Sequence, residues 1–307
     1  MSESLRGGVI GAGVFGAYHA RQYARLPGVD LAAVYDPHPE RAAALAMPLG
    51  GRAFATLEEF LEAVDVVTVA SPAAWHAEQA LAAVKAGKPV YIEKPIATDV
   101  AKADAVAQEA ARRNLVVACG HQERVLFQVM GLFDIPAQPL RLEAVRHGTA
   151  SDRSLDVSVV LDLMIHDLDL ALALSKADPV TAEGEGAILR SDSWDVARSE
   201  VTFDDGFTAL FDVSRVAEAR RRTMKLVYPT GELEIDFLTR EFRNTTGFPL
   251  NADFAETPAA KDTLGASIEA FLAAVRGEAP RPIVTAADAI AALDLALAVE
   301  QGLAAEA

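Results

Sequence analysis

One cysteine, Cys119, occurs in the 307 residues, and this scarcity excludes two classes of protein. A single cysteine cannot form a disulfide within the chain or a Cys-x-x-Cys metal site, so a disulfide framework and a zinc finger are both excluded. The sequence also lacks an uncharged apolar run of the roughly 18 residues that a membrane span requires. Residues 7–18 imitate a signal peptide, but five of them are glycine, which disfavours a helical insertion signal. We therefore expect a cytoplasmic protein.

Positive charge is scarce as well, because 28 lysines and arginines face 44 aspartates and glutamates, for a net charge of −16. Such a surface repels a phosphate backbone and an anionic bilayer, so neither nucleic acid nor a membrane is an expected partner. The densest basic segment, Arg220-Arg221-Arg222, stands beside Glu218 and is interpreted as a solvated strand end. The hydrophobic content of 51% is ordinary for a folded protein. The length fits two domains of roughly 150 residues each.

The first 120 residues alternate short apolar runs with alanine-rich amphipathic stretches, which is the pattern of βαβ units and a parallel sheet. The expected strands, continuously apolar as buried parallel strands are, cover residues 8–10, 31–35, 66–70, 90–92 and 116–118. The expected helices cover residues 17–26, 74–86 and 100–112. This pattern predicts an N-terminal Rossmann domain, a doubly wound α/β fold, over residues 1–120.

Beyond residue 120 the pattern changes to longer segments of alternating polarity, which are typical of an antiparallel sheet with one covered face. These segments cover residues 140–147, 196–203, 207–214, 223–228 and 232–238. Turn signals such as Asp205-Gly206 separate several of them, and two helices are expected near residues 264–276 and 286–302. We predict a C-terminal α/β domain over residues 121–307, built on an open, mainly antiparallel sheet.

Three glycines, Gly11, Gly13 and Gly16, follow the first expected strand and open the first expected helix, which is the context of a dinucleotide-binding loop. Gly11 permits the tight turn, Gly13 lets the backbone approach a pyrophosphate, and Gly16 lets the helix pack on the strand. Asp36 ends the second strand, where such folds place the acid that binds the adenosine ribose. A purely structural use of these residues in turns is the alternative. Asp36 would repel a 2′-phosphate and favours NAD, whereas Arg41 could reach such a phosphate and keeps NADP as the alternative.

Lys94 lies in the segment Glu93-Lys94-Pro95, directly after the expected strand 90–92. The carboxyl end of a parallel strand is where ligands bind in open α/β sheets, which makes Lys94 a candidate site residue. Pro95 keeps Lys94 out of the helical region and permits a cis bond that would fix the angle of the lysine. The alternative is an ordinary solvated lysine.

Residues 157–175 are apolar nearly all round and predict a buried helix, yet this stretch contains Asp162, His166, Asp167 and Asp169. The spacing of 162, 166 and 169 places three of these side chains on one helical face, with Asp162 one turn from His166. A carboxylate beside an imidazole can orient it and raise its pKa, as a general acid or base requires. A satisfied core histidine is the alternative. A metal is not expected, because His-x-x-Asp supplies only two ligands and no further cluster is evident.

Taken together, residues 11–16, Asp36, residues 76–95 and the pair Asp162 and His166 resemble the Gfo/Idh/MocA oxidoreductases across essentially the whole chain. The resemblance implies a Rossmann domain followed by an α/β domain on an open sheet, and redox chemistry on sugars or polyols with NAD or NADP. It implies that Lys94 and His166 form the catalytic pair and that Asp162 assists them. The cofactor residues implied are Gly11, Gly13, Val14, Phe15, Gly16, Asp36, Ser71, His76, Glu93 and Lys94.

A finer match over residues 120–124, with Arg146, Arg153 and residues 156–169, resembles the branch of this family that oxidises C3 of UDP-N-acetylglucosamine. The substrate residues implied are Lys94, His121, Arg124, Arg146, Arg153, Asp162 and His166. Arg146 and Arg153 suit a pyrophosphate substrate, since a guanidinium can chelate phosphate oxygens.

Three other interpretations stay open from the sequence. The first is an NAD(P)-dependent dehydrogenase of inositol or of another sugar. The second is a dinucleotide- or sugar-sensing regulator, whose expected mark is loss of Lys94 or His166, although both remain. The third is a structural protein that binds the cofactor. An open sheet would leave a large exposed surface, so a homodimer or homotetramer is expected in every case.

Overall fold

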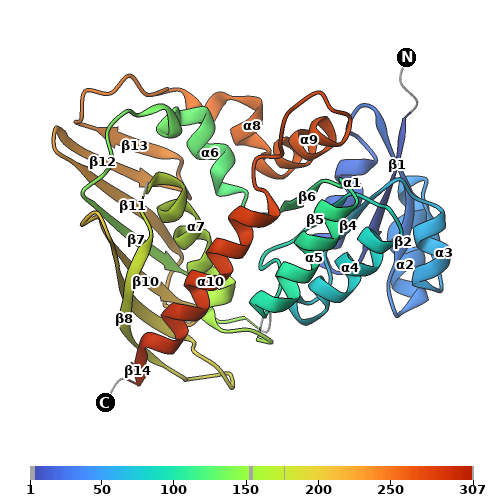
Figure 1. Cartoon of the computed structure of the whole chain (residues 1–307), viewed down its shortest axis with the longest axis horizontal. Coiled ribbons are helices and arrows are strands. Elements are labelled where there is room, and N and C mark those ends of the chain that lie inside the picture. The colour runs from blue at the N-terminus through green and yellow to red at the C-terminus, as the bar shows by residue number, and fades with distance from the viewer. Residues whose placement is uncertain (1–3, 152–154, 176, 306–307) are drawn as a thin grey trace. The chain divides into compact units, whose positions relative to one another are not determined.

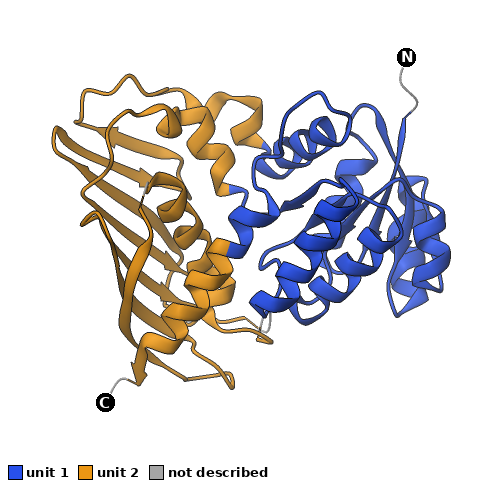
Figure 2. Ribbon diagram, in the orientation of Figure 1, with its two compact units in different colours: residues 1–122, 262–290 blue, residues 123–261, 291–307 orange. Residues whose placement is uncertain are grey.

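The computed structural model describes residues 4–151, 155–175 and 177–305, and the chain forms two compact units (Figure 2). Unit 1 comprises Met1–Gln122 and Asp262–Ile290, and unit 2 comprises Glu123–Lys261 and Ala291–Ala307. No helix in the described part of the chain has the length and hydropathy needed to cross a membrane.

Unit 1 is built on a parallel sheet of six strands in the order β3-β2-β1-β4-β5-β6 (Figure 1). The strands are β1 (Leu5–Ile10), β2 (Val29–Tyr35), β3 (Arg52–Phe54), β4 (Val66–Val69), β5 (Val90–Ile92) and β6 (Val117–Cys119). The chain adds strands on one side of β1 and then continues from β4 on the other side. The order therefore reverses between β1 and β4, and ligands of doubly wound sheets bind at the carboxyl ends of the strands at such a reversal.

Helices cover both faces of this sheet (Figure 1). They are α1 (Val14–Tyr23), α2 (Pro39–Ala46), α3 (Leu57–Glu62), α4 (His76–Lys85), α5 (Val100–Arg112) and α9 (Thr263–Val275). Side chains cap several of them: Thr56 accepts from a backbone N–H of α3, Asp99 from α5 and Asp262 from α9. Helix α1 differs, because Gly13 stands at its N-cap and no described side chain caps it.

Unit 2 is built on a mixed, mainly antiparallel sheet of eight strands in the order β13-β12-β11-β7-β10-β9-β8-β14. The strands are β7 (Arg141–His147), β8 (Pro179–Ala187), β9 (Val196–Phe203), β10 (Thr208–Ser214), β11 (Arg221–Tyr228), β12 (Gly231–Asp236), β13 (Glu241–Asn244) and β14 (Leu303–Ala305). Alternate residues of β7, β9 and β10 are buried, so one face of the sheet is covered and the other is open. Both sheets confirm the predicted fold class.

The helices of unit 2 lie along the covered face of its sheet (Figure 1). They are α6 (Glu123–Met130), the π-helical turn Val160–Met164, α7 (Ile165–Leu174) and α8 (Pro258–Lys261), and α10 (Ala286–Gly302) begins in unit 1 and continues here. The single helix predicted over residues 157–175 is therefore a π turn followed by an α-helix. The sequence analysis also missed β8, whose glycines Gly184 and Gly186 give a poor strand signal. A Cβ at Gly184 would collide with the backbone of Arg198, so close strand pairing requires glycine there.

The compact units depart from the expected division after residue 120, because residues 262–290 belong to unit 1. Three side chains of α9, those of Ile268, Phe271 and Leu272, are buried in the unit 1 core beside β1 and α1. At the sheet edge, the backbone N–H of Cys119 donates to the carbonyl of Val284 over 3.2 Å. A boundary drawn from the change of pattern could not foresee this return of the chain, because it depends on packing between distant segments.

Candidate active site

The glycine loop of unit 1 joins β1 to α1, and its three glycines are required for different reasons. Gly11 has a φ of +100°, and a Cβ there would lie 2.7 Å from the carbonyl oxygen of Ala70. A Cβ on Gly16 would collide with the carbonyl oxygen of Gly11. Gly13 has a φ of −77°, and no described atom lies within 4 Å of the position its Cβ would take. Neither backbone conformation nor packing therefore demands glycine at position 13, and the open space beside an uncapped helix N-terminus fits the pyrophosphate of a dinucleotide.

Asp36 is held against this loop by backbone hydrogen bonds. Its Oδ2 accepts the N–H of Ala12 over 2.8 Å, and its Oδ1 accepts the N–H of His38 over 2.9 Å. Each carboxylate oxygen keeps a further lone pair, so Asp36 can still accept from ribose hydroxyls. Val14 and Phe15, in the first turn of α1, are half-exposed apolar side chains at the same loop. The residues of this loop therefore fit a bound dinucleotide.

His76 and Ser71 connect two loops at the carboxyl ends of β4 and β5. The Nδ1 atom of His76 lies 2.7 Å from the carbonyl oxygen of Pro95, and its Nε2 atom lies 2.8 Å from that of Ser71. Burial lowers the pKa of His76. The Ser71 hydroxyl donates to Gln79 over 2.6 Å. Both ring nitrogens of His76 lie within hydrogen-bond distance of backbone carbonyls, so His76 joins these loops, and the cofactor role that the resemblance implied stays a prediction.

The segment Glu93-Lys94-Pro95 follows β5, and the Lys94–Pro95 peptide bond is cis. Lys94 is half-buried. Glu93 is 5% exposed, and its Oε1 lies 2.6 Å from the Nε2 of His19 on α1. Burial favours the neutral carboxyl, but the hydrogen bond and charge of His19 outweigh it and lower the pKa of Glu93. Glu93 is thus a buried anion that ties α1 to the loop of Lys94.

The second group of candidate residues lies entirely within unit 2, around His166 at the start of α7. Its Nδ1 lies 2.8 Å from Oε2 of Glu123, the first residue of α6. The Nη1 of Arg146 donates to the other oxygen of Glu123 over 2.8 Å. Arg146 also donates through Nε and Nη2 to both oxygens of Asp167, each over 2.8 Å. The four side chains form a continuous network from His166 to Asp167.

Charge neighbours keep Glu123 ionised despite its burial. Burial favours the neutral acid, but the charges of His166 and Arg146 outweigh that effect and hold the pKa of Glu123 well below its ordinary value. An ionised carboxylate only accepts hydrogen bonds, so Nδ1 of His166 must carry the hydrogen of this bond. In the neutral ring the lone pair then lies on Nε2. When His166 is neutral, the network therefore favours the tautomer that presents Nε2 as a base.

This arrangement differs from the one inferred from helical spacing. The carboxylate observed at Nδ1 of His166 comes from Glu123, whereas the sequence pointed to Asp162. Asp162 lies within the π turn, where the α-helical i, i+4 geometry does not hold. Asp169, expected on the same face, is 1% exposed and forms a bidentate ion pair with Arg124 at 2.7 and 2.8 Å. A role for Asp162 beside His166 stays a prediction.

Four further residues were expected to bind the substrate, two of them, Arg146 and Arg153, at its pyrophosphate. Arg146 is 2% exposed and its guanidinium is bonded to two carboxylates, which corrects the expectation that it chelates phosphate. Arg124 is buried against Asp169, and His121 is buried. Arg153 lies outside the described residues. Sequence reasoning gave Glu123 no role, although Arg146 stands at an inward position of its alternating strand and so required a buried anion.

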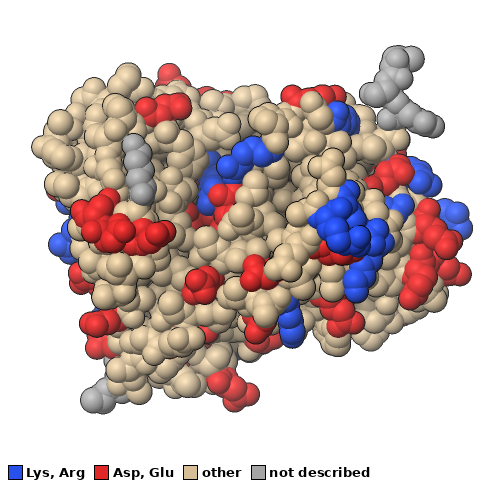
Figure 3. All heavy atoms as spheres, in the orientation of Figure 1, with Lys and Arg blue, Asp and Glu red and all other residues tan. Residues whose placement is uncertain are grey.

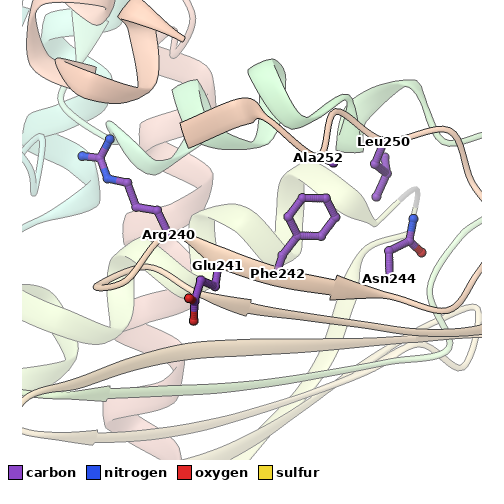
Figure 4. Close-up of a pocket in the computed structure, with 6 residues that line it drawn as sticks. All are labelled: Arg240, Glu241, Phe242, Asn244, Leu250 and Ala252. Carbon is purple, nitrogen blue, oxygen red and sulfur yellow. The ribbon is translucent and has the colours of Figure 1, made fainter. Parts of the chain in front are cut away.

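One pocket lies apart from these residues. A pocket on unit 2, lined by β13 and the segment near Leu250, contains none of the predicted site residues (Figure 4). Within the described residues, no three His, Cys, Asp or Glu side chains are grouped so as to hold a metal ion.

Acidic side chains are scattered over the visible face of both units, in keeping with the net charge of −16 (Figure 3).

The matches to family models define the class of protein. Residues 5–121 match the GFO/IDH/MocA oxidoreductase family, NAD-binding Rossmann fold, and residues 132–234 match the GFO/IDH/MocA C-terminal domain. The chain belongs to this family of oxidoreductases, and its first unit is the NAD-binding Rossmann fold of the family. The resemblance, the enzyme class and NAD as the cofactor, all expected from the sequence, are confirmed.

Individual members of this family are similar to the chain over different shares of its length. The chain is 37% identical over 284 residues to UDP-N-acetylglucosamine 3-dehydrogenase of Acidithiobacillus ferrooxidans, with 90% of each chain covered. A solved structure of UDP-N-acetylglucosamine 3-dehydrogenase from that organism is similar with a TM-score of 0.90 at 35% identity, over 98% of each chain. An inositol 2-dehydrogenase of Cereibacter sphaeroides is 32% identical over 189 residues, which are 59% of this chain and 57% of the relative.

Proposed function

We propose that this protein is an NAD-dependent dehydrogenase that oxidises the C3 hydroxyl of UDP-N-acetylglucosamine to a ketone. The observation that carries the reaction type is the 2.8 Å contact between Nδ1 of His166 and the ionised Glu123, which leaves Nε2 of the neutral ring as the base. The substrate is supported by the relative of that activity, which is similar over 90% of both chains. The product, a 3-keto sugar nucleotide, suits a later amination toward a 2,3-diamino sugar of lipid A.

The base in this proposal is Nε2 of His166. It takes the proton of the C3 hydroxyl while Glu123 stabilises the imidazolium that forms, and Arg146 holds Glu123 in place. Lys94 acts on the same hydroxyl, where its ammonium group stabilises the developing alkoxide by charge and hydrogen bonding. Asp162 is proposed to assist as a further carboxylate near the reacting group.

NAD, when bound, supplies the carbon that accepts the hydride from C3, so one hydride and one proton leave the alcohol together. Gly13, Val14 and Phe15 at the start of α1 would hold its pyrophosphate, and Asp36 would bind the adenosine ribose. Glu93 and His76 would position Lys94 and the loops around it through the bonds described above.

The direct test is NADH formation by the purified protein with NAD and UDP-N-acetylglucosamine, coupled to a ketone trap because alcohol oxidation by NAD is uphill. Mass spectrometry should show a sugar nucleotide lighter by two hydrogens, and Lys94→Ala should abolish it. Failure to form this product while the protein still binds NADH would contradict the proposed substrate.

The second candidate is an inositol dehydrogenase, favoured by the relative of that name at 32% identity. Its shorter match, 59% of this chain against 90%, ranks it below the sugar nucleotide. The same assay with myo-inositol separates the two.

We further propose a cytoplasmic homodimer or homotetramer formed through the open face of the unit 2 sheet, which light scattering after size-exclusion chromatography would test.

A further inference from the structure

We propose that Arg222 binds a phosphate group of the sugar-nucleotide substrate. The proposal rests on the proposed function, and it assigns the phosphate contact to a residue that the sequence analysis had treated as part of a solvated strand end. It also replaces Arg146, whose guanidinium is committed to carboxylates.

The register of the sheet places Arg222 on the covered face. In the antiparallel pairing of β11 with β7, Arg222 stands directly opposite Arg146, and directly opposite residues share one face of a sheet. Met224 and Leu226, two and four residues further on, are buried on that same face. Arg221 stands on the other face and is exposed. Only the middle member of the arginine run is therefore directed toward the helices of unit 2.

Ion pairing distinguishes Arg222 from the other enclosed arginines of its unit. Arg124 forms an ion pair with Asp169, Arg146 with Glu123 and Asp167, and Arg215 with Asp195, while Arg240 donates a hydrogen bond to the carbonyl oxygen of Ala260. Arg222 is half-buried, yet within the described ranges no side chain or carbonyl forms a hydrogen bond or ion pair with its guanidinium, and neighbouring carboxylates act on it only through their charge. A half-buried arginine whose guanidinium is bonded to no carboxylate is well suited to an anionic ligand.

The surroundings of Arg222 are electrostatically unfavourable for a lone cation. Burial lowers its pKa, and the charge of Arg146 lowers it further, while the charges of Glu123 and Asp167 act in the opposite direction without forming an ion pair. The guanidinium remains charged at any physiological pH. A phosphate would give this guanidinium a hydrogen-bonded anionic partner, and the planar fork of a guanidinium matches two phosphate oxygens.

The position also suits the chemistry of the substrate. Glu123 acts electrostatically on Arg222 and is bonded to His166, so the arginine and the proposed base lie around the same carboxylate. In UDP-N-acetylglucosamine the diphosphate is attached at C1 and the reacting hydroxyl is at C3 of the same ring. The residue that binds the phosphate must therefore lie close to the base without contacting the reacting hydroxyl.

The test compares Arg222→Met with the matched control Arg221→Met, the exposed neighbour on the opposite face. Isothermal titration with UDP and the KM for UDP-N-acetylglucosamine are measured for both and for the unmodified protein. We expect Arg222→Met to lower the affinity for UDP and to raise the KM for UDP-N-acetylglucosamine, each by about 10- to 100-fold, the range of one charged hydrogen-bonded contact. Affinity for NADH and the melting temperature should stay the same, and Arg221→Met should match the unmodified protein. Arg222→Lys should recover part of the loss, because lysine provides charge without the bidentate fork.

Equal UDP affinity and equal KM in Arg222→Met and the unmodified protein would overturn the assignment. If Arg222→Met does not fold, Arg222→Lys decides alone, and UDP affinity equal to that of the unmodified protein would then overturn it. If Arg222→Met loses UDP affinity but the unmodified protein does not oxidise UDP-N-acetylglucosamine, the phosphate contact is supported and the proposed reaction is contradicted. The two claims therefore fail separately.

Discussion

The glycine loop of unit 1 and the His166 network of unit 2 show two ways of building a binding site. The loop is made by the backbone: three glycines, the uncapped N-terminus of α1 and two N–H groups that fix Asp36. The network is made by side chains that come from α6, β7 and α7, with Glu123 and His166 separated by 43 residues. The first kind of site is encoded in one short stretch of sequence, whereas the second exists only after the chain has folded.

The largest expected effect concerns the stability of the side-chain network. Arg146→Met would leave Glu123 and Asp167 as buried charges without their partner, which should lower the free energy of unfolding by about 3–5 kcal/mol. Arg141→Met, on the same strand but exposed and paired with Glu143, is the matched control and should change stability by less than about 1 kcal/mol. Chemical denaturation measures both. Equal losses would show that the network adds nothing beyond a surface ion pair.

The next effect concerns turnover. His166→Ala or Lys94→Ala should lower kcat by roughly 100-fold or more, because each removes a group proposed to act on the reacting hydroxyl. NADH binding, followed by fluorescence, should be retained, since the glycine loop is untouched. Near-normal turnover in either variant would remove that residue from the catalytic pair.

A smaller effect should distinguish Glu123 from a residue that is merely structural. Glu123→Gln keeps a hydrogen-bond acceptor for His166 but removes the negative charge, so kcat should fall by about 10-fold, as for groups that orient a ligand or base. Loss of the anion destabilises the imidazolium, so the acid limb of the pH–rate profile should move to lower pH. Arg146 and Arg222 are further charged groups that interact with Glu123 and could also shape this limb. An unchanged acid limb would contradict the role of Glu123.

The same carboxylate gives a stability prediction with a defined sign. The pKa of Glu123 in the fold lies well below the ordinary 4.5, so its contribution is present above that pH and is lost as the pH falls through the folded-state value. The difference in unfolding free energy between the unmodified protein and Glu123→Gln should therefore shrink on acidification below about pH 4.5. If this difference in unfolding free energy does not vary with pH, it arises from packing and not from the charge of Glu123.

The smallest effect tests the backbone-built site. Gly13→Val should weaken NADH binding by about 10-fold, because the added side chain would occupy space that no described protein atom fills. Its melting temperature should change little. Gly16→Val is the contrast, because its side chain would collide with the carbonyl of Gly11 and should destabilise the fold itself. If both variants lose stability equally, the space at Gly13 is not a ligand site.

The comparison also explains which parts of the molecule could be predicted. The loop, Asp36 and the position of Lys94 after β5 follow from local rules, and five of the six strands of the parallel sheet were anticipated, whereas the short β3 was missed. Glu123 was overlooked because its partner Arg146 lies 23 residues away on another element. Arg222 was dismissed because three consecutive arginines suggest solvent, although the alternation of a strand turns the middle one inward. The π turn around Asp162 carries no signal in the sequence that we can identify.

The return of the chain to its first unit has a consequence for recombination. Because α9 completes the core around β1 and α1, the segment 1–122 is not a self-sufficient module. An exchange of substrate specificities between relatives must therefore use two junctions, one near residue 122 and one near residue 262, so that the donor sequence is inserted within the nucleotide-binding fold. A chimera joined only at the first junction would combine parts of one hydrophobic core from two different proteins.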